Sequence, residues 1–198
     1  MHPSRAFRWD DPAALLAFVG STGFARIFLT TPEGPRVAHA PVIVVGDALR
    51  FHLAHANALT PHLDGRIALL LAEGPNAYLS ANWYADVRGA VPSWNYVAVE
   101  AEGPVRRLDH TALVDLLDRA AAVLEPRVGE DWTRAKMEPA RFEAMTRAIT
   151  AFELTPTVWR GTAKLSQNKP ADEAARLIAG MERSGATAMA AAMRAARA

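Results

Sequence analysis

The chain has 198 residues, of which 51% are apolar and 22% charged, a composition typical of a globular protein. Its 22 lysines and arginines nearly balance 21 acidic residues, so charge does not favour nucleic-acid binding, which usually brings a basic excess or stripe. The absence of cysteine excludes disulfides and thiolate metal sites. No apolar run approaches the roughly 20 residues that cross a bilayer, and the start lacks the apolar core of a signal peptide. We therefore expect a soluble, cytoplasmic protein.

The first half of the chain predicts one short helix and then closely spaced strands. A helix is predicted at 13–19, because Asp11 can accept hydrogen bonds from its first amides and Pro12 suits its first turn. Gly46-Asp47 is a two-residue hairpin signal, and Pro41 indicates an edge position or a bulge. The pattern of apolar residues predicts strands at 24–30, 37–45, 49–54, 66–73, 76–80 and 94–106. Strands this close must be mainly antiparallel, because parallel neighbours need long crossovers.

The second half predicts helices around one further strand. Residues 109–124 form an amphipathic pattern, and another helix is predicted at 139–150. A strand at 152–161 and an Ala-rich helical tail follow. The fold class expected is α+β, mainly β: a six- to seven-stranded antiparallel barrel with peripheral helices. We expect a single domain, 1–198, with a helical insertion at about 109–150 and a helical C-terminal tail at about 171–198.

Polar side chains gather in four segments, at 51–57, 77–84, 92–96 and 164–170. Together they supply aromatic rings, hydroxyls, amides and a few cations, but few carboxylates. A metal site is not indicated, because His52 and His55 are three apart and fall on opposite faces of a strand. The nucleophile elbow, the P-loop and the G-x-G-x-x-G motif are also absent. The set suits a flat aromatic ligand with an anionic end.

Each segment also has a plainer explanation. Asn57 could cap the short helix that follows it, and residues 166–168 could form only a turn. Trp83 and Tyr84 could be aromatic residues of the core or of a dimer interface.

These segments resemble the PaiB family, whose members are described as FMN-binding negative transcriptional regulators. The motifs that carry the resemblance are HLAHAN (52–57), AYLSANWY (77–84), VPSWNYVAVEAEG (91–103), FELTPTVWRGTAKLSQNKP (152–170) and IAGME (178–182). The resemblance implies a split β-barrel of the kind found in pyridoxamine-phosphate oxidase. It also implies a homodimer that holds FMN in a groove at the subunit interface. The pair Asn57-Ala58 departs from the Asn-Pro expected of the family.

The resemblance further implies which residues would bind the cofactor. The strand and turn at 52–57 would meet the FMN phosphate, and Trp94 and Asn95 would line the flavin, with the partner subunit as one possible source. The segment at 164–168 would close over the site, since amides both donate and accept and so suit the flavin's pyrimidine edge. The implied FMN-binding residues are His52, Leu53, His55, Asn57, Trp94, Asn95, Lys164, Ser166, Gln167 and Asn168. No catalytic residue and no metal ligand is predicted.

Three functions stay open from the sequence. The first is an FMN-binding negative transcriptional regulator that acts as a homodimer and senses flavin or redox state. The second is a flavin-dependent oxidoreductase of a small substrate, and the third is a haem-handling split-barrel protein; enzymatic activity is thus left open. DNA contact is possible by family resemblance, but charge does not support it. We expect the four arginines of the tail to lie on a solvated helix face.

Overall fold

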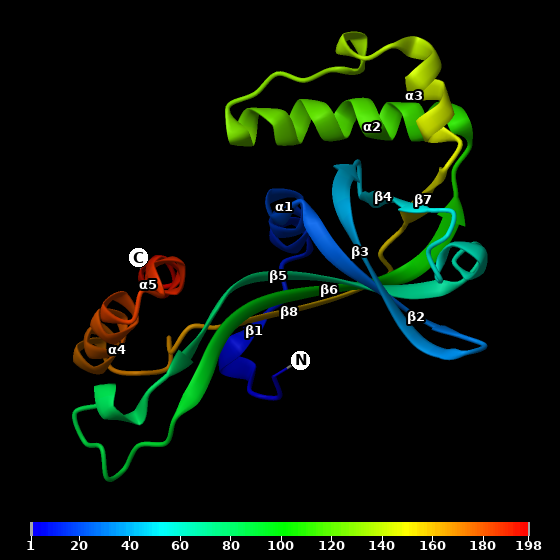
Figure 1. The fold of residues 1–198 in the computed structure, drawn as a ribbon. Coiled ribbons are helices and arrows are strands. Elements are labelled where there is room, and N and C mark those ends of the chain that lie inside the picture. Colours follow the sequence, from blue (N-terminus) through cyan, green and yellow to red (C-terminus); the bar gives the residue numbers. More distant parts are fainter. Residues whose placement is uncertain (1, 198) are drawn as a thin grey trace. The chain divides into compact units, whose positions relative to one another are not determined.

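The computed structural model describes residues 2–197, which divide into two compact units (Figure 1). The barrel unit comprises Pro12–Ala72 and Glu100–Trp159. The terminal unit comprises the described residues of Met1–Asp11, Glu73–Val99 and Arg160–Ala198, and so includes both ends of the chain. Each unit is described by itself.

The strands form an eight-stranded antiparallel sheet in the order β1-β8-β6-β5-β2-β3-β4-β7, and a further pairing of β6 with β7 closes six of them into a ring. The strands that meet in the barrel unit are β2 (Phe24–Thr31), β3 (Gly34–Val45), β4 (Ala48–Ala54), β7 (Ile149–Leu154), the first part of β5 (Ile67–Leu79) and the last part of β6 (Ser93–Arg107). The predicted antiparallel barrel with peripheral helices is therefore confirmed. The hairpin signal is confirmed as well, since Gly46 has a φ of 59° and Val45 pairs with Ala48.

The barrel interior is built by the alternation of side chains along its strands. In β4, Leu49, Phe51 and Leu53 are buried, whereas Arg50 and His52 between them are only half-buried on the outer face. Phe51 pairs with Phe152 of β7, and their rings stack with centroids 5.8 Å apart. Burial of each such large apolar side chain contributes about 1.5–3 kcal/mol.

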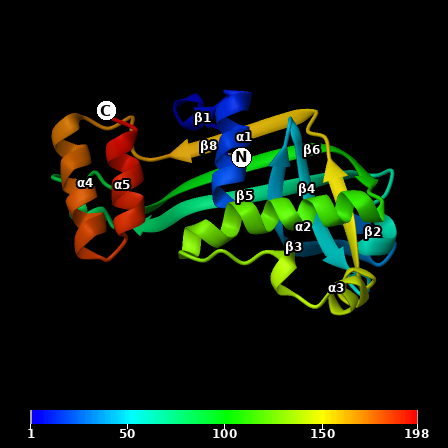
Figure 2. The same cartoon turned by 90° about the horizontal axis from the view of Figure 1, so that it is seen from above.

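Helices cover the outer face of the barrel. They are α1 (Pro12–Thr22), α2 (His110–Leu124) and α3 (Pro139–Thr146), with short 3₁₀ turns η2 (Thr60–His62), η4 (Glu125–Val128) and η5 (Arg134–Lys136). Asp109 caps α2, because its Oδ1 accepts a hydrogen bond from the Ala112 amide at 2.8 Å. Leu113 and Leu116 pack α2 onto Ile43 of β3 and Ala151 of β7. Figure 2 shows α2 lying across this part of the sheet, with α3 beside one of its ends.

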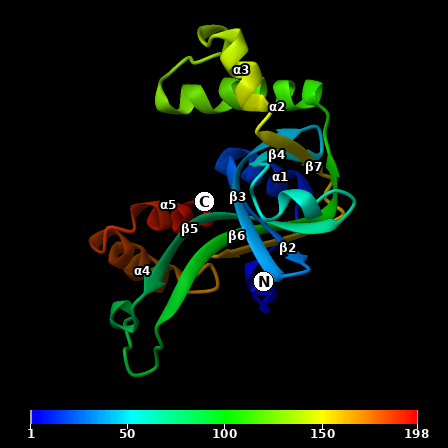
Figure 3. The same ribbon diagram turned by 45° about the vertical axis from the view of Figure 1, so that its right-hand side comes forward.

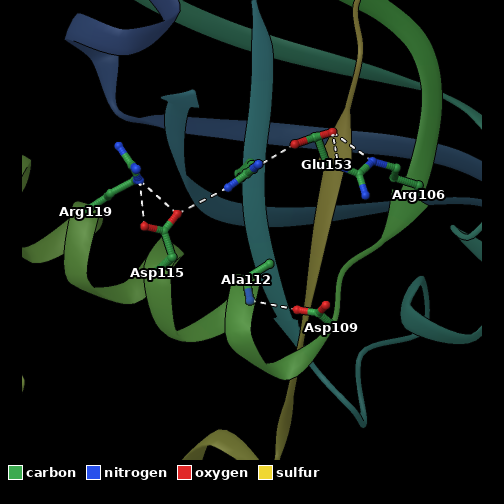
Figure 4. Close-up of polar contacts among 7 residues, drawn as sticks. Arg106, Asp109, Ala112, Asp115, Arg119 and Glu153 are labelled. Atoms are coloured by element: carbon green, nitrogen blue, oxygen red, sulfur yellow. Dashed lines mark hydrogen bonds and ion pairs between the residues drawn. The ribbon is translucent and has the colours of Figure 1, made fainter. Parts of the chain in front are cut away.

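A row of charged side chains ties three neighbouring strands together on the outer face (Figure 4). Glu153 of β7 lies opposite Arg50 of β4 and Arg106 of β6. It accepts from Arg50 Nε at 2.7 Å and from Arg106 Nε at 2.8 Å. Asp115 of α2 extends the row, with Arg50 Nη1 at 3.3 Å and Arg119 Nε at 2.8 Å. The row reinforces the two pairings that β7 makes as the strand that closes the ring.

The terminal unit contains β1 (Arg8–Trp9) and most of β8 (Val158–Lys164), which pair at Arg8 and Thr162. It also contains the last part of β5 and the first part of β6. Its other elements are η1 (Arg5–Phe7), η3 (Ala81–Trp83), α4 (Ala171–Arg183) and α5 (Thr187–Ala195). Helices α4 and α5 lie side by side (Figures 2 and 3). Gly180 of α4 lets the Trp83 ring approach so closely that a Cβ at this position would lie 2.3 Å from it. Trp83 is therefore a packing residue of this unit.

Two predicted element boundaries were wrong. The strands expected at 66–73 and 76–80 form the single strand β5, since Gly74 and Pro75 keep to extended backbone. The strand expected at 152–161 is instead two strands, β7 and β8. The break falls where Gly103 of β6 approaches Thr155: a Cβ on Gly103 would lie 2.0 Å from the Thr155 carbonyl oxygen.

The predicted helix at 139–150 also ends early, at Thr146, because the chain enters β7 at Ile149. None of the helices among residues 2–197 combines the length and the apolarity needed to cross a bilayer.

Candidate functional site

The residues predicted to bind a ligand fall on both units. His52, Leu53, His55 and Asn57 belong to the barrel unit. Trp94, Asn95, Lys164, Ser166, Gln167 and Asn168 belong to the terminal unit. Within each unit the structure brings some of these side chains together and gives others a role in folding.

In the terminal unit, four predicted residues line one recess of about 240 Å³, which we call the terminal recess. They are Asn95, Lys164, Ser166 and Asn168, accompanied by His2, Phe7, Leu79, Tyr84, Val91, Ser93 and Lys169. Asn95 is fully buried, because it shares the inward face of β6 with Val97 and Val99. Its Nδ2 donates to Ser166 Oγ at 3.0 Å. An amide and a hydroxyl are thus fixed to one another in the wall of this recess.

The turn after β8 holds Ser166 in an unusual conformation. Ser166 has a φ of 59°, and among the described residues it is the only non-glycine with a positive φ. Such a conformation costs about 1–3 kcal/mol and persists only where the surrounding structure holds it. Gln167 holds this turn, because its Oε1 accepts from the Leu165 amide at 2.8 Å and its Nε2 donates to the carbonyl oxygens of Ala6 and Ala163. Gln167 therefore has a folding role, with its side-chain amide already engaged.

Two lysines give the terminal recess positive charge. Lys164 Nζ donates to Ser93 Oγ at 2.5 Å and lies 5.9 Å from the centre of the Phe7 ring. Lys169 lies over the Tyr84 ring at 5.1 Å. Burial raises the pKa of Tyr84, and the nearby Glu173 carboxylate adds to this, so the phenol stays protonated as a donor. The recess can thus hold an anion or the polar edge of a ring.

Trp94 lies on the opposite face of β6 from Asn95, because successive residues of a strand alternate. The indole is 50% exposed, donates from Nε1 to Asn76 Oδ1 at 3.1 Å and meets the Tyr78 ring edge-on. In one chain, therefore, Asn95 lines the terminal recess and Trp94 lies on an exposed surface across the strand from it.

In the barrel unit, two of the predicted residues have folding roles. The Leu53 side chain is buried in the barrel core, so only its backbone could contact a ligand. Asn57 Oδ1 accepts from the Leu59 amide at 2.9 Å and so holds the turn before η2, whose N-cap residue is Leu59. His52 and His55 remain, and they line different hollows of the barrel unit.

His55 lines a recess of about 250 Å³ beside the start of α2, which we call the cationic recess. Arg107, His110 and Arg147 line it as well, and its wall also includes Asp109, whose carboxylate is occupied as the α2 cap. His110 contacts Thr146 Oγ1 at 3.2 Å and Glu143 at 3.6 Å. Further lining residues are Leu108, Leu113, Thr146, Ile149, Thr150 and Ala151.

Three basic side chains of the cationic recess form no hydrogen bond or ion pair with other described side chains. The side chains of His55, Arg107 and Arg147 have no hydrogen-bond or ion-pair partner within residues 2–197. Thr150 is only 4% exposed, and its Oγ1 is buried with no partner in the described part of the chain. Thr150 lies opposite Leu53 and two residues before Phe152, so its side chain is on the inner face of β7 and its hydroxyl does not open into the recess.

His52 lines a hollow of about 630 Å³ with mostly apolar walls, which we call the apolar cavity. Its walls come from α2, α3, the segment 125–137, and Ile149 of β7. Burial lowers the pKa of His52, so its ring is neutral at physiological pH.

Neither hollow of the barrel unit was predicted as such. Arg107 and Arg147 are ordinary surface arginines in the sequence, and only their places beside the ends of β6 and β7 bring them to His55. The signal that could have identified them is the position of Arg107 at the end of β6 and of Arg147 shortly before the start of β7. Within residues 2–197 no cluster of three or more His, Asp or Glu side chains could hold a metal ion.

Comparison with known proteins places this architecture among flavin-related proteins. Residues 1–157 match the family described as "Putative FMN-binding domain". The chain is also similar to a Bacillus subtilis (strain 168) protein named Protease synthase and sporulation protein PAI 2. The two are 25% identical over 179 residues, which cover 85% of this chain and 83% of the relative.

Solved structures share the fold at low sequence identity. The FAD and heme binding protein of Mycobacterium smegmatis aligns with a TM-score of 0.64 at 16% identity, covering 85% of this chain and 78% of that one. The flavocytochrome Anf3 of Azotobacter vinelandii also gives 0.64 at 16% identity, with 82% and 72% covered. The conserved hypothetical protein Rv2991 of Mycobacterium tuberculosis gives 0.58 at 16% identity, with 85% and 94% covered.

Proposed function

This chain belongs to the FMN-binding domain family of the PaiB type, and on that premise we propose that it binds FMN with the phosphate in the cationic recess. The resemblance predicted from the motifs is thereby confirmed at the level of the family. The family match does not locate the phosphate, and the cationic recess is the location that we assign to it.

The observation that carries the proposal is the convergence of His55, Arg107 and Arg147 on one recess, with side chains that have no partner within residues 2–197. A phosphate dianion would accept hydrogen bonds from the guanidinium groups of Arg107 and Arg147. Guanidinium groups bind phosphate through paired hydrogen bonds, which are shorter and stronger than bonds to neutral acceptors. The donor set therefore fits the charged end of FMN, and His55 keeps the phosphate-binding role that the motif implied.

The chemistry of such a complex is divided between cofactor and protein. When bound, FMN supplies electron-transfer chemistry through its ring system. The residues of the cationic recess would bind and orient it: the guanidinium groups of Arg107 and Arg147 would neutralise the phosphate, and His55 would lie beside it. Asp109 keeps the start of α2 in place through its cap.

Replacing both arginines tests the phosphate location. Charge-assisted hydrogen bonds contribute about 1.5–3 kcal/mol each, so the double variant Arg107→Ala, Arg147→Ala should bind FMN at least tenfold more weakly in fluorescence titrations. Arg141→Ala is the matched control, because this arginine is exposed on α3 of the same unit and lines none of the hollows described. Equal FMN affinity in the double variant and the control would refute the location.

The terminal recess retains its predicted link to FMN as a proposal. Lys164, Ser166 and Asn168 present a cation, a hydroxyl and an amide, which match the polar groups of a flavin nucleotide. In the same titration, Lys164→Ala should weaken FMN binding, and an unchanged affinity would assign these side chains to another role.

We also propose that two copies of the chain associate. The exposed indole of Trp94 and the exposed Tyr78 ring beside it form an aromatic surface of the kind that is enriched in protein interfaces. Sedimentation measurements distinguish a single chain of 21.4 kDa from a pair of twice that mass.

A regulatory role remains the favoured biological function. It is supported by the name of the Bacillus subtilis relative, which refers to protease synthesis and sporulation. The alternative is an FMN-dependent oxidoreductase. Anaerobic bleaching of bound FMN by a nicotinamide, with repeated turnover on adding an acceptor, would support the alternative against the regulator.

A further inference from the structure

The apolar cavity is a feature that FMN phosphate binding does not use. Its volume of about 630 Å³ lies within the range of about 300–1,000 Å³ found for small-molecule sites. The lining residues are His52, Leu117, Ala120, Ala121, Leu124, Glu125, Trp132, Lys136, Met137, Phe142, Met145, Thr146 and Ile149. Aromatic rings and flexible thioethers of this kind accommodate flat apolar molecules.

The charged side chains of the lining are already engaged with neighbouring groups. Lys136 Nζ pairs with the Asp131 carboxylate. Glu125 Oε2 accepts from the Trp132 amide at 3.4 Å. The Glu125 carboxylate has no ion-pair partner among the described residues, so an anionic ligand would lose its hydration and meet a like charge in the cavity wall.

His52 is the polar group that the lining leaves unused. It stands on the outer face of β4, and its ring has no hydrogen-bond partner within residues 2–197. A neutral imidazole offers one donor and one acceptor. One hydroxyl group on a ligand would satisfy this ring without bringing charge into the cavity.

From this arrangement we propose that the apolar cavity binds an uncharged aromatic compound of about two fused rings, with a hydroxyl group hydrogen-bonded to His52. The cavity adjoins the cationic recess, since Thr146 and Ile149 line both, but the proposal does not depend on the proposed phosphate location. In a regulatory protein such a compound would act as an effector, and in an enzyme as a substrate.

Isothermal titration calorimetry with 2-naphthol tests the site on the full chain, both free and saturated with FMN. We expect one 2-naphthol per chain in both forms and at least tenfold weaker binding of naphthalene-2-sulfonate, which carries a charge. Failure of 2-naphthol to bind, or equal binding of the sulfonate, would overturn the proposal. Displacement of 2-naphthol by FMN would also overturn it, because the cavity would then belong to the flavin.

Two alanines of α2 give a matched pair of variants. Ala120 lines the cavity, whereas Ala122 lies on the same helix, exposed and outside the lining. Ala120→Phe should lower the affinity for 2-naphthol at least tenfold, and Ala122→Phe should leave it unchanged. An equal loss in both variants would contradict a site in this cavity.

His52→Leu tests the polar contact without filling the cavity. The variant should bind 2-naphthol about three- to tenfold more weakly than the parent. If His52→Leu binds 2-naphthol as the parent does, the ligand's hydroxyl does not meet this ring and the proposed ligand class is wrong. Thermal melting of all three variants identifies any that fails to fold.

Discussion

Thr150 is, at the residue scale, a cost to the fold. Its hydroxyl is buried and has no partner in the described part of the chain. Its side chain lies on the inner face of β7, opposite Leu53 and two residues before Phe152. An unsatisfied buried polar group costs about 1–3 kcal/mol.

Thr150→Val should therefore affect stability and not binding. Valine has nearly the same shape as threonine without the hydroxyl, so in the absence of FMN the free energy of unfolding should stay unchanged or rise by up to about 1 kcal/mol. The affinity for FMN should stay the same, because the hydroxyl does not open into the cationic recess. Urea unfolding and FMN titration measure the two quantities. A variant that is less stable than the parent would show that the hydroxyl stabilises the fold.

At the scale of elements, β7 is the strand that closes the ring, and Glu153 joins it to both neighbours. Burial alone would raise the pKa of Glu153, but the hydrogen bonds from Arg50 and Arg106 outweigh it, so the pKa lies below its ordinary value. The carboxylate therefore stabilises the fold fully above its unfolded pKa of about 4.3. This contribution is lost as the pH falls from there through the lower folded pKa.

Glu153→Gln should lower the free energy of unfolding at neutral pH by about 1–3 kcal/mol, because Arg50 then loses its buried partner. The difference between variant and parent should shrink as the pH falls below about 4, where the parent's carboxylate also becomes neutral. Urea unfolding at a series of pH values measures this difference. A gap that stays constant down to pH 3 would mean that charge at Glu153 does not stabilise the closure.

The elements themselves were largely predictable, because alternation, hairpin signals and helix caps are local properties of the sequence. The hairpin at Gly46 and the helix begun by Asp109 follow directly from such signals. The break near Thr155 did not, since it is caused by a close approach of Gly103, some 50 residues away along the chain.

At the scale of the whole molecule, the family motifs predicted the right fold, but the implied FMN-binding residues fall in separate hollows. Asn95, Lys164, Ser166 and Asn168 do meet in one recess. Gln167, by contrast, is engaged in holding its turn, which no motif could reveal. Arg107 and Arg147 were missed because their meeting depends on the register of β6 and β7 in the closed ring.

A comparison of FMN with riboflavin tests the central claim most directly, because the two ligands differ only in the phosphate. Fluorescence titrations of the parent should show FMN binding at least tenfold more tightly than riboflavin. In the double variant Arg107→Ala, Arg147→Ala this ratio should fall close to one, while the affinity for riboflavin stays the same. A ratio that the double variant leaves unchanged would contradict the account, since the phosphate would then be held somewhere other than the cationic recess.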